Sequence, residues 1–180
     1  MERRLLVGGF GGQGVMVIGQ LMCYTACETT DLEVTFFPSY GGEQRGGTAN
    51  CSVIIADEEI GSPLVNFPDI LMSFNLPSFE KFEPSVKEGG LLFADSSLIT
   101  KTSKRDDIKA FYVPATALAS DNNLTGMANV IMLGKLIRET NLFGYETFVH
   151  HLTKGIPESK AALIEKNQKA FDLGYRYDKA

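Results

Sequence analysis

The stretch Leu5-Leu6-Val7-Gly8-Gly9-Phe10-Gly11-Gly12-Gln13-Gly14 decides the fold of this 180-residue chain. It begins as a short apolar run, typical of a buried strand, and ends in closely spaced glycines. Residues 15–28 follow as an apolar segment long enough for a mostly buried helix. The sequence therefore predicts a strand, a glycine turn and a helix, which is a Rossmann-like start to an α/β domain.

The rest of the chain repeats this alternation. Short runs predict strands at residues 33–37, 50–56, 69–74, 91–94 and 108–113, and longer segments predict helices at 77–86, 115–119, 126–140, 145–153 and 158–173. This order predicts a three-layer α/β domain with a mainly parallel sheet and helices on both faces. Residues 50–56 follow 33–37 too closely for a crossover helix, so that pair is either antiparallel or joined by an extended excursion. No repeat or linker divides the chain, and we expect residues 1–180 to form one domain.

Three glycines of the opening stretch, Gly9, Gly11 and Gly14, have the spacing of the dinucleotide fingerprint, between a strand and a helix. Such glycines let a phosphate approach the backbone N–H groups at the start of a helix. A nicotinamide site also needs an acid at the end of the second strand. That strand here ends Phe36-Phe37-Pro38-Ser39, which contains no acid. Three interpretations stay open: a nicotinamide site, a site for phosphate or another anion, and glycines used only for turning and packing. The predicted cofactor-binding residues are Gly9, Gly11, Gly12, Gln13 and Gly14.

A second glycine-rich stretch, from Tyr40 to Asn50, carries four glycines together with charges of both signs. A simple turn needs only one or two glycines, whereas two Gly-Gly pairs let the backbone pass close to another body. Arg45 could bind a carboxylate or phosphate through two parallel hydrogen bonds, although it could instead merely pair with Glu43. We predict a loop that contacts a partner or an active site through Tyr40, Glu43, Gln44, Arg45, Gly46, Gly47 and Asn50.

Composition argues against several classes of function. The net charge of −5 argues against nucleic acid or an anionic membrane as the main partner. The N-terminus lacks a signal-peptide pattern and no apolar run approaches the ~20 residues of a membrane helix, so we expect a cytoplasmic protein. The three cysteines include no Cys-x-x-Cys pair and so give no zinc or iron–sulfur motif, although Cys23 and Cys27 at helical spacing could in principle hold a metal.

Candidates for catalysis are few. His150 and His151 are adjacent on a predicted helix, so their side chains diverge and do not easily share a metal. Asp95 ends a predicted strand and is a better site candidate than the neighbouring serines, which have no visible base. The amphipathic helix at 158–173 either lies on the domain or docks a partner subunit. We assign no catalytic residue and no metal ligand to the chain.

The two glycine stretches also carry a resemblance. Gly9-Phe10-Gly11-Gly12-Gln13-Gly14-Val15, the segment from Phe37 to Cys51, and Ile60-Gly61-Ser62-Pro63 resemble the gamma subunit of 2-oxoacid:ferredoxin (acceptor) oxidoreductases, a likeness that covers nearly the whole chain. Thr48-Ala49-Asn50 is most similar to the 2-oxoglutarate branch, while branches acting on 2-oxoisovalerate, pyruvate or indolepyruvate share much of the pattern. The chain departs from many relatives at Gly42, where proline is expected, and this should leave the loop more flexible without a partner.

The resemblance implies CoA-dependent oxidative decarboxylation of a 2-oxoacid to an acyl-CoA and carbon dioxide, with electrons passed to ferredoxin or another acceptor. It implies that thiamine diphosphate, Mg²⁺ and iron–sulfur clusters belong to other subunits, of alpha, beta and delta type. We expect this chain alone to be inactive and to carry no bound cofactor. Two alternatives remain: a freestanding nucleotide-dependent enzyme, which would bind NAD(H) or a flavin by itself, and a purely structural assembly module.

Overall fold

The computed structural model describes residues 2–41 and 48–178, and the structural statements below refer to these residues. The first part alternates strands and helices: β1 (Glu2–Phe10), α1 (Val15–Thr29), β2 (Glu33–Tyr40), β3 (Thr48–Ala56), β4 (Ile70–Ser73), α2 (Leu76–Phe82), β5 (Leu91–Asp95) and β6 (Lys109–Val113). The second part is helical: α3 (Ala115–Asp121), α4 (Ala128–Thr140), α5 (Tyr145–Lys154) and α6 (Ala161–Tyr175), with short 3₁₀ turns at Glu83–Ser85 and Glu158–Lys160. Each predicted strand and helix is present, with shifted bounds.

The strands form one mixed sheet in the order β2-β3-β1-β4-β5-β6. β1, β4, β5 and β6 are parallel neighbours, whereas β3 runs antiparallel to β1 on one side and to β2 on the other. All strands except β3 therefore share one direction, which confirms the prediction of a mainly parallel sheet. Of the two arrangements left open for β2 and β3, the antiparallel one is correct, since Phe37 lies opposite Ser52 and Tyr40 opposite Ala49.

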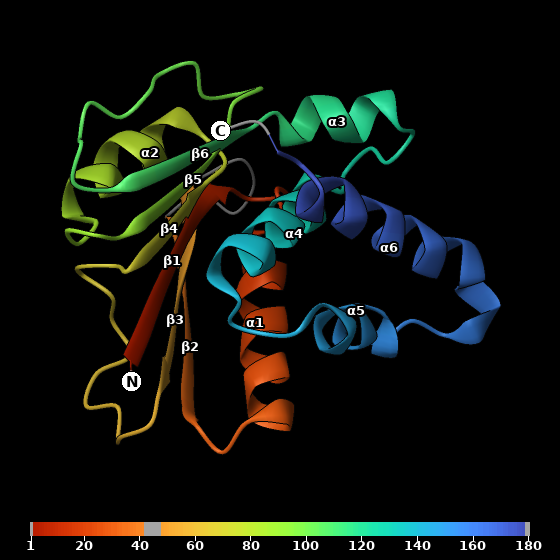
Figure 1. Cartoon of the computed structure of the whole chain (residues 1–180), viewed down its shortest axis with the longest axis horizontal. Coiled ribbons are helices and arrows are strands. Elements are labelled where there is room, and N and C mark those ends of the chain that lie inside the picture. The colour runs from red at the N-terminus through yellow and green to blue at the C-terminus, as the bar shows by residue number, and fades with distance from the viewer. Residues whose placement is uncertain (1, 42–47, 179–180) are drawn as a thin grey trace.

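Helices cover both faces of the sheet (Figure 1). On one face α1 and α4 lie against the strands with α5 and α6 outside them, and this side holds the larger core, which includes Ile18, Met72 and Phe171. On the other face α2 covers the sheet, and its Phe79 belongs to a smaller core with Leu71 of β4. The three-layer prediction is confirmed, because alternate side chains of the strands are buried on opposite faces.

Local sequence sets where the helices begin and end. Asn75 caps α2, since its Oδ1 accepts a hydrogen bond from the Ser78 N–H at 2.8 Å. Pro84 has no N–H for an α-helical hydrogen bond, so α2 ends at Phe82 and a 3₁₀ turn follows. The helix predicted from residue 126 begins at Ala128, because Gly126 has a φ of +87° that a right-handed helix excludes. None of the described helices is long and apolar enough to cross a membrane.

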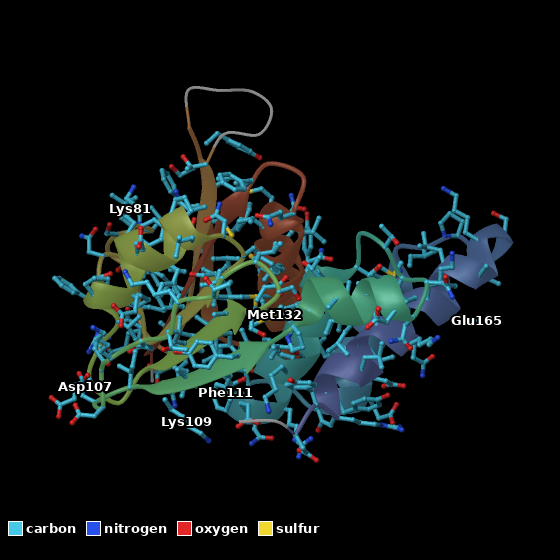
Figure 2. The ribbon with its side chains drawn as sticks, turned by 90° about the horizontal axis from the view of Figure 1, so that it is seen from above. Lys81, Asp107, Lys109, Phe111, Met132 and Glu165 are labelled. Carbon is cyan, nitrogen blue, oxygen red and sulfur yellow. The ribbon has the colours of Figure 1, made fainter. Side chains whose placement is uncertain are left out.

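Strand β6 forms one edge of the sheet and is tied to the helices by lysines. Lys109 Nζ lies 4.7 Å from the centroid of the Phe111 ring, and Lys135 Nζ of α4 lies 5.1 Å from the same ring. Figure 2 shows Lys109 and Phe111 along this edge and Glu165 far from them on α6. Lys135 also donates to Glu139 Oε1 at 2.8 Å and to the Tyr177 carbonyl at 2.9 Å, so it links β6, α4 and the segment after α6.

Candidate ligand site at the carboxyl edge of the sheet

The connections that follow β1 and β4 leave the sheet on opposite faces. β1 continues through α1 on one face, and β4 continues through α2 on the other. In open α/β sheets such a divergence leaves a crevice beyond the carboxyl ends of the strands, where ligands bind. A cleft of about 370 Å³ lies there. Its lining residues come mainly from the first glycine turn, the end of β4, α3 and the start of α4: Gly12, Gln13, Phe74, Leu98, Thr116, Ala119, Ser120, Thr125, Gly126 and Ala128.

Gln13 holds the first glycine turn in shape. Its Oε1 accepts a hydrogen bond from the Phe10 N–H at 2.6 Å, and its Nε2 donates to the Phe74 carbonyl at 3.1 Å. The backbone N–H of Gln13 also donates to the Phe10 carbonyl at 3.2 Å. One amide side chain therefore ties the turn to the ends of both β1 and β4, and its polar atoms are engaged within the protein.

The glycines of this turn differ in what surrounds them. A Cβ at Gly9 would lie 2.8 Å from Gln13 Oε1 and 2.9 Å from a methyl carbon of Val15, so this position is filled by the protein. Gly14 has a φ of +78°, and a Cβ there would overlap the side-chain amide of Asn129. Gly12 has a φ of +98° and no atom within 4 Å of its Cβ position. Gly11 and Gly12 are exposed, and of the predicted glycines Gly12 lines the cleft.

Two helices begin at the cleft. α1 follows Gly14 and α4 follows Met127, and in this described part of the chain neither helix has a side-chain cap or an acid in its first turn. The first N–H groups of a helix have no partner within the helix, and the helix dipole makes that end favourable for an anion. None of the lining residues carries a charge. Among the described residues, the lining of the cleft therefore offers neutral hydrogen-bond donors.

Asp95, the candidate at the end of β5, lies at the same edge but is engaged internally. It is fully buried. Its Oδ2 accepts hydrogen bonds from the Thr116 hydroxyl at 2.6 Å and from the Thr116 N–H at 3.2 Å, and its Oδ1 accepts one from the Ser97 N–H at 3.0 Å. These bonds fix the start of α3 to the end of β5, so Asp95 shapes the wall of the cleft.

The second glycine stretch leaves the sheet at the same edge. Phe10 at the end of β1 lies opposite Thr48 of β3, and the Gly41 N–H donates to the Thr48 carbonyl at 2.8 Å. Tyr40 is 71% exposed at the end of β2, and Asn50 is half-buried on β3. Glu43, Gln44, Arg45, Gly46 and Gly47 lie outside the described residues, so the contact interpreted for them stays a prediction.

The remaining candidates lie elsewhere. Burial and the adjacent Cys27 thiol raise the pKa of Cys23 to about 11, and burial raises the pKa of Cys51 to about 12, so both hold their protons at neutral pH. His151 Nδ1 lies 3.3 Å from Glu28 Oε2 on the outer side of α1. Within residues 2–41 and 48–178 no group of three or more His, Cys, Asp or Glu side chains is placed to hold a metal ion.

Asn129 lies beside this site and packs against its glycine turn, a contact that the sequence does not indicate. It lies in the first turn of α4, directly after the cleft-lining Ala128, and its amide lies against Gly14. The only sequence signal was its place after Gly126-Met127-Ala128 at a predicted helix start. Its approach to Gly14 depends on how α4 packs beside α1, which local sequence does not indicate.

Comparison with known proteins identifies the family of the chain. The family model for pyruvate ferredoxin/flavodoxin oxidoreductase matches residues 4–177. The chain is 33% identical to the 2-oxoglutarate synthase subunit KorC of Methanocaldococcus jannaschii, over 99% of this chain and 95% of KorC. It is 40% identical over 136 residues to the ketoisovalerate oxidoreductase subunit VorA of Methanothermobacter marburgensis. Those residues are 76% of this chain but 28% of VorA, so the chain spans less than a third of that relative.

Solved structures share the fold. The gamma subunit of a keto/oxoacid ferredoxin oxidoreductase from Geobacter sulfurreducens matches with a TM-score of 0.82 and 26% identity, over 97% of this chain and 95% of that chain. A 2-oxoglutarate:ferredoxin oxidoreductase from Magnetococcus marinus matches with a TM-score of 0.85 and 23% identity, over 99% of this chain and 32% of that one. The resemblance drawn from the two glycine stretches is confirmed, and the chain belongs to the pyruvate ferredoxin/flavodoxin oxidoreductase family.

Proposed function

We propose that the chain is the gamma-type subunit of a multisubunit 2-oxoacid:acceptor oxidoreductase that acts on 2-oxoglutarate. The observation that carries this proposal is the end-to-end similarity to KorC, which covers 99% of this chain and 95% of that relative. In this proposal residues 1–180 form one domain of the complex. The complex converts the 2-oxoacid and CoA to an acyl-CoA and carbon dioxide, and ferredoxin or another acceptor takes the electrons.

Within such a complex this chain supplies binding surface. The cleft has no charged lining residue, and the described residues contain no cluster suited to a metal ion. By its similarity to subunits of such complexes, we assign thiamine diphosphate, Mg²⁺ and the iron–sulfur clusters to partner subunits of alpha, beta or delta type, where thiamine diphosphate would supply the carbanion chemistry. We expect the isolated chain to show neither 2-oxoacid oxidation nor visible absorbance from a bound cofactor.

The first glycine turn has the features of a site for a phosphate group of CoA. Gly12 is open on the cleft, and the uncapped starts of α1 and α4 favour an anion. In this assignment Gly11 and Gly12 approach the ligand, while Gly9, Gln13 and Gly14 hold the turn in shape. The nicotinamide interpretation is weaker, because β3 lies between β1 and β2. The strand end that binds the ribose in dinucleotide folds is thereby displaced from the first turn.

The second glycine stretch is assigned a contact with a partner subunit. Tyr40 and Asn50 flank the predicted contact residues at the same sheet edge as the cleft, and Tyr40 is 71% exposed. A large exposed aromatic side chain is typical of an interface anchor. The contact would place the first glycine turn and the neighbouring subunit at one shared site.

A second candidate substrate is 2-oxoisovalerate. The 40% identity to VorA is higher than the identity to KorC, although it covers 76% of this chain. The two candidates differ in the group bonded to the 2-oxo carbon, which ends in a carboxylate in 2-oxoglutarate and is a branched apolar group in 2-oxoisovalerate. An activity assay with both 2-oxoacids therefore distinguishes the two candidate substrates.

The experiment is to purify the native complex through a tag on this chain, identify the co-purifying subunits by mass spectrometry, and assay a panel of 2-oxoacids with CoA and an artificial electron acceptor. The proposal expects partner subunits with thiamine and cluster motifs, and 2-oxoglutarate as the substrate with the highest kcat/KM. Highest activity with 2-oxoisovalerate would replace the first candidate by the second. A coloured or active preparation of the isolated chain would contradict the assignment of the cofactors to partner subunits.

A further inference from the structure

The connection between β3 and β4 is a long surface segment without regular structure. It comprises residues 57–69 and lies beside the start of β1, at the opposite end of that strand from the first glycine turn (Figure 1). Connections of about 12 residues or more without a helix or strand are uncommon in compact domains and usually have a function. None of the residues that line the cleft comes from this connection, so a function here would be separate from the cleft.

The connection is anchored in the domain by some of its apolar side chains and exposes others. Val65 is buried in the smaller core with Leu6, and Pro68 is also buried. Leu64 and Phe67, directly before these two anchors, are 55% and 62% exposed. Because Val65 and Pro68 occupy the inward positions, the domain itself does not cover Leu64 and Phe67. Grouped exposed apolar side chains of this kind mark a contact with another molecule.

The backbone of the connection has few hydrogen bonds within the part of the chain that the structure describes. Over residues 58–67 one backbone N–H donates, that of Leu64 to Ser62 Oγ at 3.3 Å, and no backbone carbonyl accepts. Backbone polar groups of a folded protein are nearly always paired with protein or with water. These groups are therefore free to bond either to water or to a second chain.

An acidic hollow of about 610 Å³ lies beside the exposed apolar side chains, and Leu64 is part of its lining. The charged residues that line it are Glu2, Arg4, Asp57, Glu58 and Glu59. Arg4 is the one cation among these described residues, and its guanidinium pairs with Glu2. Glu58 and Glu59 are exposed and form no ion pair with a described residue. Their charges favour a cationic group in the hollow.

We propose that residues 58–67 form a second docking surface, which binds a partner-subunit segment that carries lysine or arginine beside an apolar side chain. The inference rests on the proposed function for the existence of a partner subunit and adds a contact at the opposite end of the sheet from the cleft. The cation enters the acidic hollow, and the apolar side chain packs on Leu64 and Phe67. A symmetric contact between two copies of this surface is disfavoured, because it would bring acidic side chains together.

The first test is made on the complex purified through a tag on this chain. Glu58→Lys with Glu59→Lys should reduce the amount of co-purified partner subunit about tenfold, because the cation of the partner then meets like charges. The control is Asp106→Lys with Glu165→Lys, which makes the same change in net charge at two exposed positions outside the connection. The control should assemble as the wild type does. Equal loss in both double variants would overturn the assignment to this surface.

Phe67→Ser tests the apolar half of the contact in the same purification. Loss of an interface aromatic should reduce the co-purified partner subunit about fivefold. Tyr24→Ser is the matched control, because Tyr24 on α1 is also 62% exposed. Assembly of Phe67→Ser at the level of Tyr24→Ser would overturn the apolar contact.

Hydrogen exchange on the wild-type complex keeps the inference testable if the variants do not accumulate. The backbone amides of residues 58–67 should exchange slowly in the complex, because a docked partner covers N–H groups that this chain leaves without an acceptor. Lys101 and Thr102 are the internal reference, since they are exposed and their N–H groups also have no acceptor in the described chain. Exchange over residues 58–67 as fast as at the reference would overturn the inference.

The outcomes separate this inference from the proposed function. If the wild-type chain co-purifies no other oxidoreductase subunit, the proposed function fails and the inference fails with it. If the wild type assembles and the surface variants assemble as well as their controls, the second docking surface is wrong and the proposed function stands.

Discussion

Glycines at the start of α4 and halfway along it serve opposite purposes. Where α4 crosses α6, a Cβ at Gly134 would overlap the Phe171 carbonyl, and a Cβ at Gly174 would overlap the Ile131 carbonyl. At the start of α4, a Cβ at Gly126 would meet no atom within 4 Å, and the same holds for Gly12 across the cleft. The crossing uses glycine to bring two backbones together, whereas the cleft uses it to leave space.

This difference indicates at which positions a substitution should change the stability of the chain and at which it should change ligand binding. The crossing is closed by protein on all sides and is reinforced by the polar bonds of Lys135 and Arg138 to the carbonyls of Tyr177 and Tyr175. The cleft is open, and none of the described residues that line it is charged. We therefore expect substitutions at the crossing to unfold the chain, and substitutions at the cleft to change the affinity for a ligand.

The largest effect is expected for Gly174→Ala. Alanine is the better helix former by about 1 kcal/mol, but the new methyl group would overlap the Ile131 carbonyl, and overpacking of this kind should cost about 3 kcal/mol of unfolding free energy. Denaturant unfolding of the chain measures the change. The control is Gly155→Ala, where φ is −85° and no atom lies within 4 Å of the Cβ position. Equal stability of the two variants would show that α4 and α6 can separate at little cost.

Glu139→Gln tests the charges beside the same crossing. Burial alone would raise the pKa of Glu139, but the hydrogen bond and charge of Lys135, with a contribution from Lys109, lower it. The pair therefore stabilises the fold above the unfolded-state pKa of about 4.3, and this contribution is lost as the pH falls through the lower folded-state pKa.

The substitution leaves the buried Lys135 ammonium without its carboxylate and should lower the free energy of unfolding by about 2 kcal/mol at pH 7. This loss is smaller than is usual for a fully buried ion pair, because Lys135 keeps its hydrogen bond to the Tyr177 carbonyl. Melting temperatures between pH 3 and pH 7 measure it, with the exposed Glu165→Gln as the control. A melting curve of Glu139→Gln that retains the full acid dependence of the wild type would contradict this account.

Gly12→Ala tests the role of the glycine turn at the cleft. Residue 12 has a positive φ, so alanine should cost about 1 kcal/mol of stability through backbone strain. The methyl group also enters the cleft and should raise the KM for CoA about tenfold, which corresponds to about 1.4 kcal/mol. Gly89→Ala is the matched control, because Gly89 has a φ of +75° and an open Cβ position away from the cleft. If both variants lose stability and neither alters the KM for CoA, the glycine turn serves conformation only.

Tyr40→Ala should have the smallest effect on the chain and a measurable one on the complex. The side chain is largely exposed, so the melting temperature of the isolated chain should barely change. Loss of an interface aromatic should weaken subunit assembly by about 1 kcal/mol, or roughly fivefold. Tyr24→Ala removes another exposed tyrosine, 62% exposed on α1, and serves as the control. Assembly equally affected by both variants would show that Tyr40 marks no special contact.

Much of the candidate site follows from local sequence. The apolar run, the glycines and the following helix predicted a turn at the carboxyl edge, and the positive φ of Gly12 and Gly14 agrees with the use of glycine there. The roles of individual residues did not follow. Cofactor binding by Gln13 stays a prediction, and the sequence does not indicate that its amide bonds to Phe10 and Phe74. A hydrogen bond to the end of another strand is set by the sheet and not by neighbours in the chain.

The elements, their order and the family resemblance can be read from the sequence, because strand and helix periodicity, turn residues and capping act over a few neighbouring positions. Three features become visible only in the folded chain: β3 lies between β1 and β2, Gly134 and Gly174 bring α4 against α6, and the Asn129 amide fills the space left by Gly14. These contacts join residues far apart in the chain. They depend on how whole helices and strands pack, and that is fixed by the burial of two shared cores on opposite faces of the sheet.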